Sequence, residues 1–289
     1  MHYEGTIIRP PSEADSIILQ VTVGCSYNRC TFCGTYKDVE FRIKDQETIE
    51  QDLDFAARYC RKLKRVFLAD GDVLSLPQPK LLNLFALIKE RLPWISRISL
   101  YANARSLRAK SVDDLRKLKS SGLARIYLGL ESGHDATLQA IRKGADAAIM
   151  IAAGRKAREA EIFLSVTVLL GIAGSSLSQE HAKDTGKVLT AMEPNHIGVL
   201  TLMLLENTPL YELFGQGVFQ LPDQMGLLAE LYTMVDNIHL DRVLFHSNHA
   251  SNYLPIDCRL SRDREKVLAT IANAISGNVP LVPEFRRAL

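Results

Sequence analysis

The chain has 289 residues, 47% of them hydrophobic, which is typical of a globular protein able to bury a large core without disulfides or structural metals. Its 35 basic and 33 acidic residues nearly cancel, giving a net charge of +2, so we expect no general attraction to nucleic acid or to an anionic membrane. Residues 1–11 lack the apolar segment of a secretory signal, and the apolar run 162–174 is too short to span a bilayer. We therefore expect a cytoplasmic protein with neither a membrane nor a nucleic acid as partner.

Strands and helices alternate along the first two thirds of the chain. Short β-rich apolar runs are followed by segments with helical spacing of apolar residues, and this alternation predicts a parallel sheet with crossover helices. Six strand–helix units favour an α/β fold of the partial (β/α)6 TIM-like barrel type. The expected strands are 16–24, 65–69, 97–102, 125–130, 163–171 and 196–204, and the expected helices are 46–63, 78–91, 112–120, 135–142, 147–160 and 178–192.

The alternation weakens after residues 207–209. A helix over 224–238, a short strand over 243–245 and a helix over 262–275 are expected there. We interpret residues 1–211 as the barrel core. Residues 212–289 are then a C-terminal extension, a short α/β cap packed on the same domain.

Three cysteines lie in the loop after the first expected strand, at positions 25, 30 and 33. Thiolates suit zinc and iron–sulfur clusters, but a structural zinc site needs four closed ligands, usually in two separated pairs. Cys60 and Cys258 are isolated in the sequence, so no second pair exists. Three ligands instead leave one iron of a 4Fe–4S cluster open to a small molecule. The sequence therefore predicts Cys25, Cys30 and Cys33 as metal ligands and as the catalytic centre.

This loop resembles the signature of the radical S-adenosylmethionine (SAM) superfamily, in particular its Elp3, MiaB and NifB types. That signature is C-x3-C-x2-C with an aromatic residue before the last cysteine, and Phe32 stands at that position. The first gap here is one residue longer, C-x4-C-x2-C. Confirmation is therefore expected from the other loops.

Polar and glycine residues follow the next two expected strands, where α/β barrels collect functional groups. Asp70-Gly71-Asp72 resembles the glycine-rich stretch at which the family binds the SAM amino group. Asn103 and Arg105 follow the third strand, where family members place polar SAM contacts. The resemblance implies that all five residues bind the cofactor.

The later strand ends resemble the family as well. The segment around Glu131 and Ser132, followed by Lys143, resembles the G-x-E-S-G…K-G pattern, which implies that Glu131 and Ser132 face SAM and that Lys143 pairs with its carboxylate. Gly171 and Ile172 stand where the family binds the adenine ring. The resemblance extends over residues 16–211 and includes the turn 205–210.

What this resemblance implies is reductive cleavage of SAM at a 4Fe–4S cluster, with an electron from flavodoxin or ferredoxin and a radical that takes hydrogen from a substrate. Two unpaired cysteines cannot hold a second cluster, so we expect a compact enzyme acting on a small molecule. The coproporphyrinogen dehydrogenase signature is absent, because 19–25 reads LQVTVGC. Two alternatives stay open, a tRNA-modifying enzyme of the same family and a non-catalytic iron–sulfur carrier or chaperone.

Other residues have more than one interpretation. The segment 246–253 is either a loop that satisfies its own backbone or a lid over the substrate. Tyr101 and Tyr127 are either core residues or neighbours of the substrate radical. Cys60, on an apolar helix stripe, is expected to be buried, and Cys258 has no assigned role.

Overall fold

The computed structural model describes residues 1–288, and the chain divides into two compact units. Unit 1 comprises residues 1–28, 35–128 and 156–164. Unit 2 comprises residues 29–34, 129–155 and the chain from Ser165 on.

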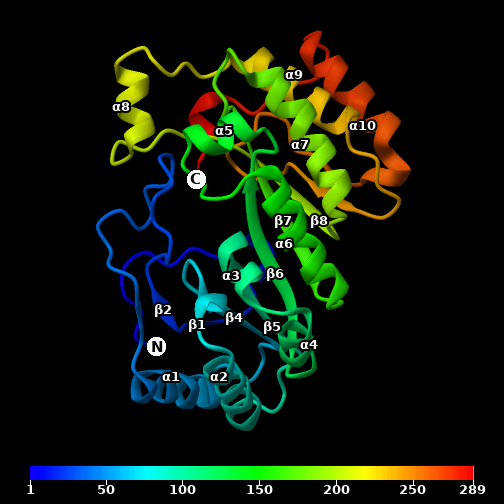
Figure 1. The fold of residues 1–289 in the computed structure, drawn as a ribbon. Coiled ribbons are helices and arrows are strands. Elements are labelled where there is room, and N and C mark those ends of the chain that lie inside the picture. Colours follow the sequence, from blue (N-terminus) through cyan, green and yellow to red (C-terminus); the bar gives the residue numbers. More distant parts are fainter. Residues whose placement is uncertain (289) are drawn as a thin grey trace. The chain divides into compact units, whose positions relative to one another are not determined.

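Unit 1 is built on parallel strands that neighbour one another in chain order. Leu19 of the first strand pairs with Leu68 of the next, and Leu68 pairs with Leu100. Figure 1 shows two of the unit's helices, α1 and α2, side by side. The parallel strands are β1 (Ile17–Gln20), β4 (Arg65–Ala69), β5 (Arg97–Ala102) and β6 (Leu123–Glu131), whose last three residues belong to unit 2. The other elements are the antiparallel pair β2 (Thr22–Val23) and β3 (Arg42–Ile43), the 3-10 turns Pro11–Glu13 and Val73–Ser75, and the helices α1 (Gln46–Tyr59), α2 (Gln78–Arg91), α3 (Ala104–Ala109) and α4 (Val112–Ser120).

Tyr101 and Tyr127 belong to an aromatic cluster in unit 1. The ring of Tyr101 meets that of Phe67 edge-on at 5.0 Å, and the Tyr127 ring lies 5.9 Å from both. The Tyr127 hydroxyl donates a 2.6 Å hydrogen bond to Glu13. Burial, together with this hydrogen bond, raises the pKa of Tyr127 to about 12. Both tyrosines are packing residues of this cluster.

Glu13 is fully buried and is expected to make stability depend on pH. Burial alone would raise its pKa, but hydrogen bonds from Ser16 and Tyr127 and the charge of Arg97 outweigh burial and lower it. A carboxyl with a lowered folded pKa stabilises the protein above its unfolded pKa, and this stability is lost as the pH falls through the folded pKa.

We therefore expect Glu13→Gln to lower the free energy of unfolding at pH 7 by about 1–3 kcal/mol, because an amide NH2 would face groups that donate. The difference from the unchanged protein should shrink below about pH 4.5, as measured by urea unfolding at several pH values. Glu159→Gln, with a side chain 63% exposed, is the matched control. A difference that stayed constant down to pH 3 would contradict this assignment.

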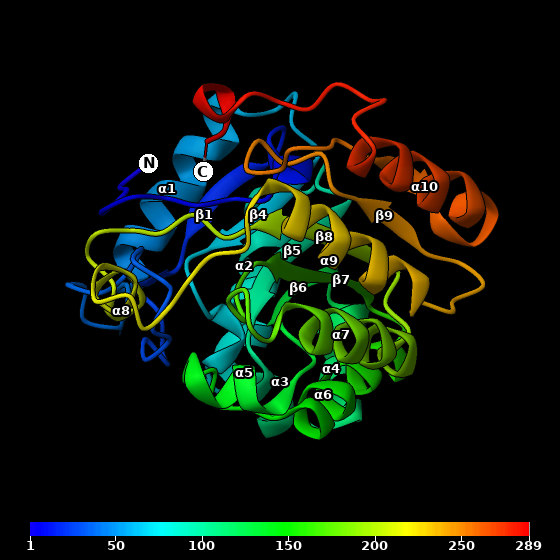
Figure 2. The same ribbon diagram turned by 90° about the horizontal axis from the view of Figure 1, so that it is seen from above.

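Unit 2 combines parallel strands with an antiparallel edge. β7 pairs in parallel with β8 and β8 with β9, whereas β10 pairs antiparallel to β9. Helix α9 packs against both α7 and α10 (Figure 2). The strands are β7 (Phe163–Leu170), which begins in unit 1 and enters unit 2 at Ser165, β8 (His196–Thr201), β9 (Leu244–His246) and β10 (Asp257–Arg259). The helices are α5 (Asp135–Ala140), α6 (Ala147–Glu159), which belongs to unit 1 from Lys156 on, α7 (Ser178–Met192), α8 (Pro209–Gly215), α9 (Gln224–Asp236) and α10 (Leu260–Ile275), with a 3-10 turn at Glu284–Arg286.

The structure departs from the expected elements at a few points. The first expected strand is broken into β1 and β2, and the first helix ends at Tyr59 with Cys60 as its C-cap. Helices α3 and α8 and strand β10 were not expected. The division into residues 1–211 and 212–289 stays a prediction. Across residues 1–288, no helix is long and apolar enough to cross a membrane.

Candidate functional site

Gly71 allows the loop after β4 to approach Cys25 closely. Cys25 follows β2, and the N–H of Gly71 donates a 3.2 Å hydrogen bond to the carbonyl of Gly24. A Cβ added to Gly71 would lie 2.9 Å from Cys25 Cβ and 3.0 Å from its Cα. Glycine is required here because any side chain would displace the cysteine backbone.

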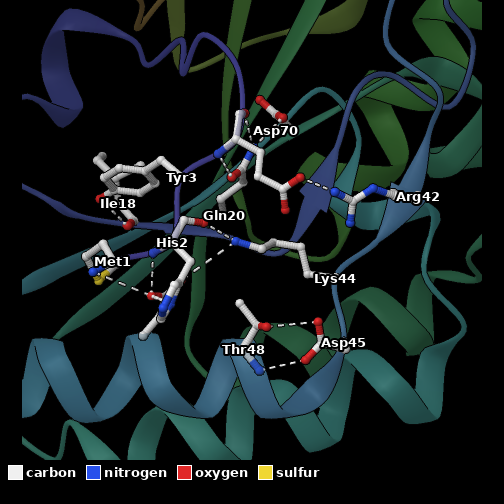
Figure 3. A network of polar contacts seen from close by, with 12 residues as sticks. Met1, His2, Tyr3, Ile18, Gln20, Arg42, Lys44, Asp45, Thr48 and Asp70 are labelled. Carbon is white, nitrogen blue, oxygen red and sulfur yellow. Dashed lines mark hydrogen bonds and ion pairs between the residues drawn. The ribbon is translucent and has the colours of Figure 1, made fainter.

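Asp70 supports this loop through hydrogen bonds, and Figure 3 shows it beside Gln20. Its Oδ2 accepts hydrogen bonds from Gln20 Nε2 at 3.0 Å and from the N–H of Gly24 at 3.2 Å, and its Oδ1 accepts one from the Tyr36 hydroxyl at 2.8 Å. Burial and the neighbouring Asp70 carboxylate raise the pKa of Tyr36, so the hydroxyl keeps its proton and donates. Gln20 and Tyr36 were not predicted from the sequence.

We expect Asp70→Asn to destabilise the protein. The asparagine amide would point its NH2 at one of three groups that already donate, leaving a buried donor without an acceptor at a cost of about 1–3 kcal/mol. Urea unfolding measures this loss. Asp15→Asn, with a side chain 83% exposed, serves as control, and equal stability of the two variants would refute the bracing role.

Asp72 differs from Asp70 in having an unused oxygen. Its Oδ2 accepts hydrogen bonds from Ser26 Oγ at 2.5 Å and Asn103 Nδ2 at 2.8 Å. Its Oδ1 is buried and has no hydrogen-bond partner among the described residues. Burial raises the pKa of Asp72 more than these hydrogen bonds lower it. A cationic donor brought to Oδ1 would satisfy the oxygen and favour the ionised carboxylate.

The two residues predicted after the third strand have different surroundings. The Asn103 side chain caps α3, where its oxygen accepts the N–H of Ser106 at 2.9 Å while its Nδ2 holds Asp72. The capping pair Asn103 and Ser106 is the signal that would have predicted α3. Arg105 is exposed on that helix.

In unit 2 the segment with the other two cysteines is fixed by backbone contacts. The N–H of Thr31 donates to the carbonyl of Ile141, and the carbonyl of Thr31 accepts the N–H of Leu210, both at 3.0 Å. Asn207 Nδ2 donates a 2.8 Å hydrogen bond to the carbonyl of Gly34, next to Cys33. Asn207 lies in the turn 205–210 and holds the cysteine segment, a role that the sequence did not reveal.

Phe32 and Ile172 lie in one apolar cluster of unit 2. The buried residues of this cluster include Leu138, Ile172 and Leu202, and Phe32 packs against them partly exposed. The structure therefore brings the predicted aromatic residue and the predicted adenine neighbour together. An apolar wall of this kind suits the flat face of a heteroaromatic ring.

The residues at the end of β6 are held by polar contacts. Lys143 Nζ donates a 2.8 Å hydrogen bond to Glu131 Oε1, and both side chains are nearly buried. Glu131 has a left-handed backbone conformation (φ 64°), which is uncommon for a residue other than glycine. Ser132 Oγ lies 2.7 Å from Nδ1 of His181. Lys143 thus contacts the Glu131 carboxylate in this structure, and its expected pairing with the carboxylate of SAM stays a prediction.

The cysteines are all partly buried. Cys25 belongs to unit 1, and Cys30 and Cys33 belong to unit 2. Among residues 1–288, no three or more His, Cys, Asp or Glu side chains form a group that is ready to hold a metal ion, so the triad stays a prediction. The residues nevertheless fit a 4Fe–4S cluster with SAM in their donor chemistry, with three thiols in one loop, a glycine cradle at Gly71 and an unsatisfied oxygen on Asp72.

The segment 246–253 and Cys258 are the remaining candidates from the sequence. Asn252 is buried and donates to the carbonyls of Val199 and Ser247 at 2.7 and 2.9 Å, while its Oδ1 accepts the Thr201 hydroxyl. Segment 246–253 thus satisfies backbone groups around it. Burial, together with the nearby Asp263 and Asp257, raises the pKa of Cys258 to about 11, which makes it a weak nucleophile at neutral pH.

Comparisons with known proteins agree with these observations. The model of the "Radical SAM superfamily" matches residues 19–185, more than half of the chain. An uncharacterized protein of Methanocaldococcus jannaschii is 23% identical over 260 residues, covering 86% of this chain and 75% of the relative. The heme chaperone HemW of Bacillus subtilis is 28% identical over 175 residues, covering 60% of this chain and 45% of HemW.

A solved structure gives the fold. Coproporphyrinogen III oxidase (HemN) from Escherichia coli, described as a radical SAM enzyme, superposes with a TM-score of 0.56 at 16% identity, covering 87% of this chain and 58% of HemN. This similarity confirms the fold class expected from the sequence. The chain spans less than half the length of HemW and little more than half that of HemN.

Proposed function

The chain belongs to the radical SAM superfamily, and from this premise we propose that it cleaves SAM and uses the resulting 5′-deoxyadenosyl radical to take a hydrogen atom from a small-molecule substrate. Enzymes of this superfamily bind a 4Fe–4S cluster and SAM. The superfamily match is the observation that carries the proposal, because residues 19–185 include the cysteine triad and the loops after four strands.

The cysteines and the loop after β4 have the first task in this proposal. Cys25, Cys30 and Cys33 would hold a 4Fe–4S cluster, which would pass an electron from the external donor to SAM for cleavage of the sulfonium C–S bond. Asp72 accepts a hydrogen bond from the ammonium group of SAM through its unused Oδ1. Asp70, whose two oxygens are already occupied, holds the loop in place.

The residues of unit 2 orient the rest of SAM. Ile172 and Phe32 provide the apolar wall for the adenine ring. Glu131 and Ser132 face the cofactor, and Lys143 sets the position of the Glu131 carboxylate through their 2.8 Å contact. Arg105 and Asn103 contribute polar contacts. Together these side chains would hold the ribose of SAM and its 5′ carbon in one orientation. A fixed orientation excludes competing reactions.

A small substrate and an external electron donor complete the proposal. The net charge of +2 offers little attraction to the tRNA phosphate backbone. Flavodoxin or ferredoxin is the proposed donor. The isolated positions of Cys60 and Cys258 support a single cluster.

The decisive experiment is anaerobic reconstitution of the protein with iron and sulfide, reduction with dithionite and addition of SAM. Formation of 5′-deoxyadenosine and methionine, measured by mass spectrometry, is the expected result. A fully loaded protein that leaves SAM intact would overturn the proposal.

Two alternatives give different results in the same preparation. A cluster carrier or chaperone would show an electron paramagnetic resonance spectrum that does not respond to SAM. Because the relative HemW is named a heme chaperone, hemin titration belongs in this arm of the test. A tRNA-modifying enzyme would bind tRNA tightly at moderate salt, where purely electrostatic binding weakens.

A further inference from the structure

A carboxyl side chain lies in the apolar interior of unit 2. Glu230 is on α9, among the buried Leu227, Leu231 and Met234, and its own side chain is fully buried. Burying an ionised carboxylate costs several kcal/mol unless other groups compensate. Among the described residues, no lysine or arginine forms an ion pair with Glu230. Its compensating groups must therefore be other polar atoms.

The partners of Glu230 lie at the end of β7. Its Oε1 accepts the N–H of Gly171 at 2.7 Å, and its Oε2 accepts the hydroxyl of Ser178, the first residue of α7. Gly171 has φ +80°, and a Cβ there would lie 3.1 Å from Leu227. Glu230 therefore fixes the backbone at the point where the chain leaves the strand.

A buried histidine extends the contact to the end of β6. His181 Nε2 lies 3.3 Å from Glu230 Oε1, and its Nδ1 lies 2.7 Å from Ser132 Oγ. Nε2 makes no hydrogen bond among the described residues, so Glu230 and His181 are close neighbours without a hydrogen bond between them, while Nδ1 and the Ser132 hydroxyl share one. Thr185, one turn further along α7, accepts the N–H of Gly133 at 2.8 Å. The loops after β6 and β7 are thus tied to one Glu–His pair.

We propose that Glu230 and His181 are positioning residues that set the two SAM-contacting loops, 131–133 and 171–172, in register with each other. The inference rests on the proposed function, since it takes these loops to hold SAM. The pair touches the loops and not the cofactor. It is therefore expected to control the affinity for SAM while leaving the cysteine loop, and hence cluster content, unchanged.

Glu230→Met separates this role from a merely structural one. Methionine fills a similar volume, but the N–H of Gly171 and the hydroxyl of Ser178 lose their acceptor, so we expect a lower unfolding midpoint. The Kd for SAM of the folded, cluster-loaded protein is expected to rise at least about tenfold, the equivalent of one buried hydrogen bond, with iron content unchanged.

Conservative and control variants sharpen the test. Glu230→Gln keeps an oxygen for Gly171 and is expected to stay within about threefold of the unchanged Kd. Glu265→Met, with a side chain 88% exposed on α10, should bind SAM normally. If Glu230→Met does not fold, His181→Phe gives the same expectation, because it removes the hydrogen bonds of Nδ1 with Ser132 and Thr185.

The outcomes are distinct. Normal SAM affinity in Glu230→Met or in folded His181→Phe, or an equal loss of affinity in Glu230→Gln and Glu230→Met, would overturn the inference. Absence of SAM binding by the unchanged, cluster-loaded protein would instead refute the proposed function.

Discussion

Replacing Cys30 with alanine is expected to abolish both iron binding and the production of 5′-deoxyadenosine. Two thiolates cannot complete the ligation of the proposed cluster, which would take three from this loop, and the remaining cysteines, Cys60 and Cys258, are isolated in the sequence. Anaerobically reconstituted protein should lose the visible absorption of the cluster, and its iron content should fall from about four atoms per chain to nearly none.

Cys60→Ala is the matched control for this experiment. Cys60 is the C-cap of α1, where its backbone N–H donates to the carbonyl of Ala56, a contact that alanine keeps. Full iron content and SAM cleavage are expected in this variant. Retention of a cluster in Cys30→Ala, or its loss in Cys60→Ala, would contradict the assignment of the triad.

Replacing Gly71 with alanine is expected to disturb the same cluster through the backbone. The new methyl group would lie 2.9 Å from Cys25 Cβ, closer than two carbon atoms approach without displacement, and 3.1 Å from the carbonyl oxygen of Gly24, which is also a tight contact. The cysteine must move, because the obstruction involves its own backbone and not the end of a flexible side chain. We expect at least a tenfold loss of SAM cleavage with reduced cluster content, about 1.4 kcal/mol or more.

Gly215→Ala provides the comparison for this substitution. Gly215 is the last residue of α8, and an added Cβ would meet nothing within 4 Å. Alanine also has a higher helix propensity than glycine, so this variant should keep full activity. Equal behaviour of the two alanine variants would show that the close approach at Gly71 has no effect on the site.

The sequence predicted the elements that have a strong local pattern. β4 (Arg65–Ala69), β5 (Arg97–Ala102), α2 (Gln78–Arg91) and α7 (Ser178–Met192) have the expected bounds, because a continuous apolar run or a helical stripe defines each of them. Helix α3 was not expected, since six residues are too few for a periodic pattern. Its capping residue Asn103 was interpreted only as a cofactor contact.

The supports of the candidate site could not be read from local patterns. Gly171 and Glu230 are 59 residues apart, and Asn207 lies 173 residues from Gly34 in the sequence. In a helix as apolar as α9, Glu230 has no neighbouring signal that distinguishes it from an exposed glutamate. The distinction between Asp70 and Asp72 likewise depends on which oxygens already have donors, and this requires the folded chain.

One further consequence comes from Gln20, whose side chain accepts the N–H of Glu4 and donates both to the Glu4 carbonyl and to Asp70. The N-terminal segment and the loop after β4 therefore contact one side-chain amide, so displacing Gln20 would break hydrogen bonds to both (Figure 3). Exchange of the Glu4 amide proton with solvent would report on the position of Gln20 beside that loop. A fusion or label attached close to Glu4 that displaced Gln20 would remove one donor from Asp70.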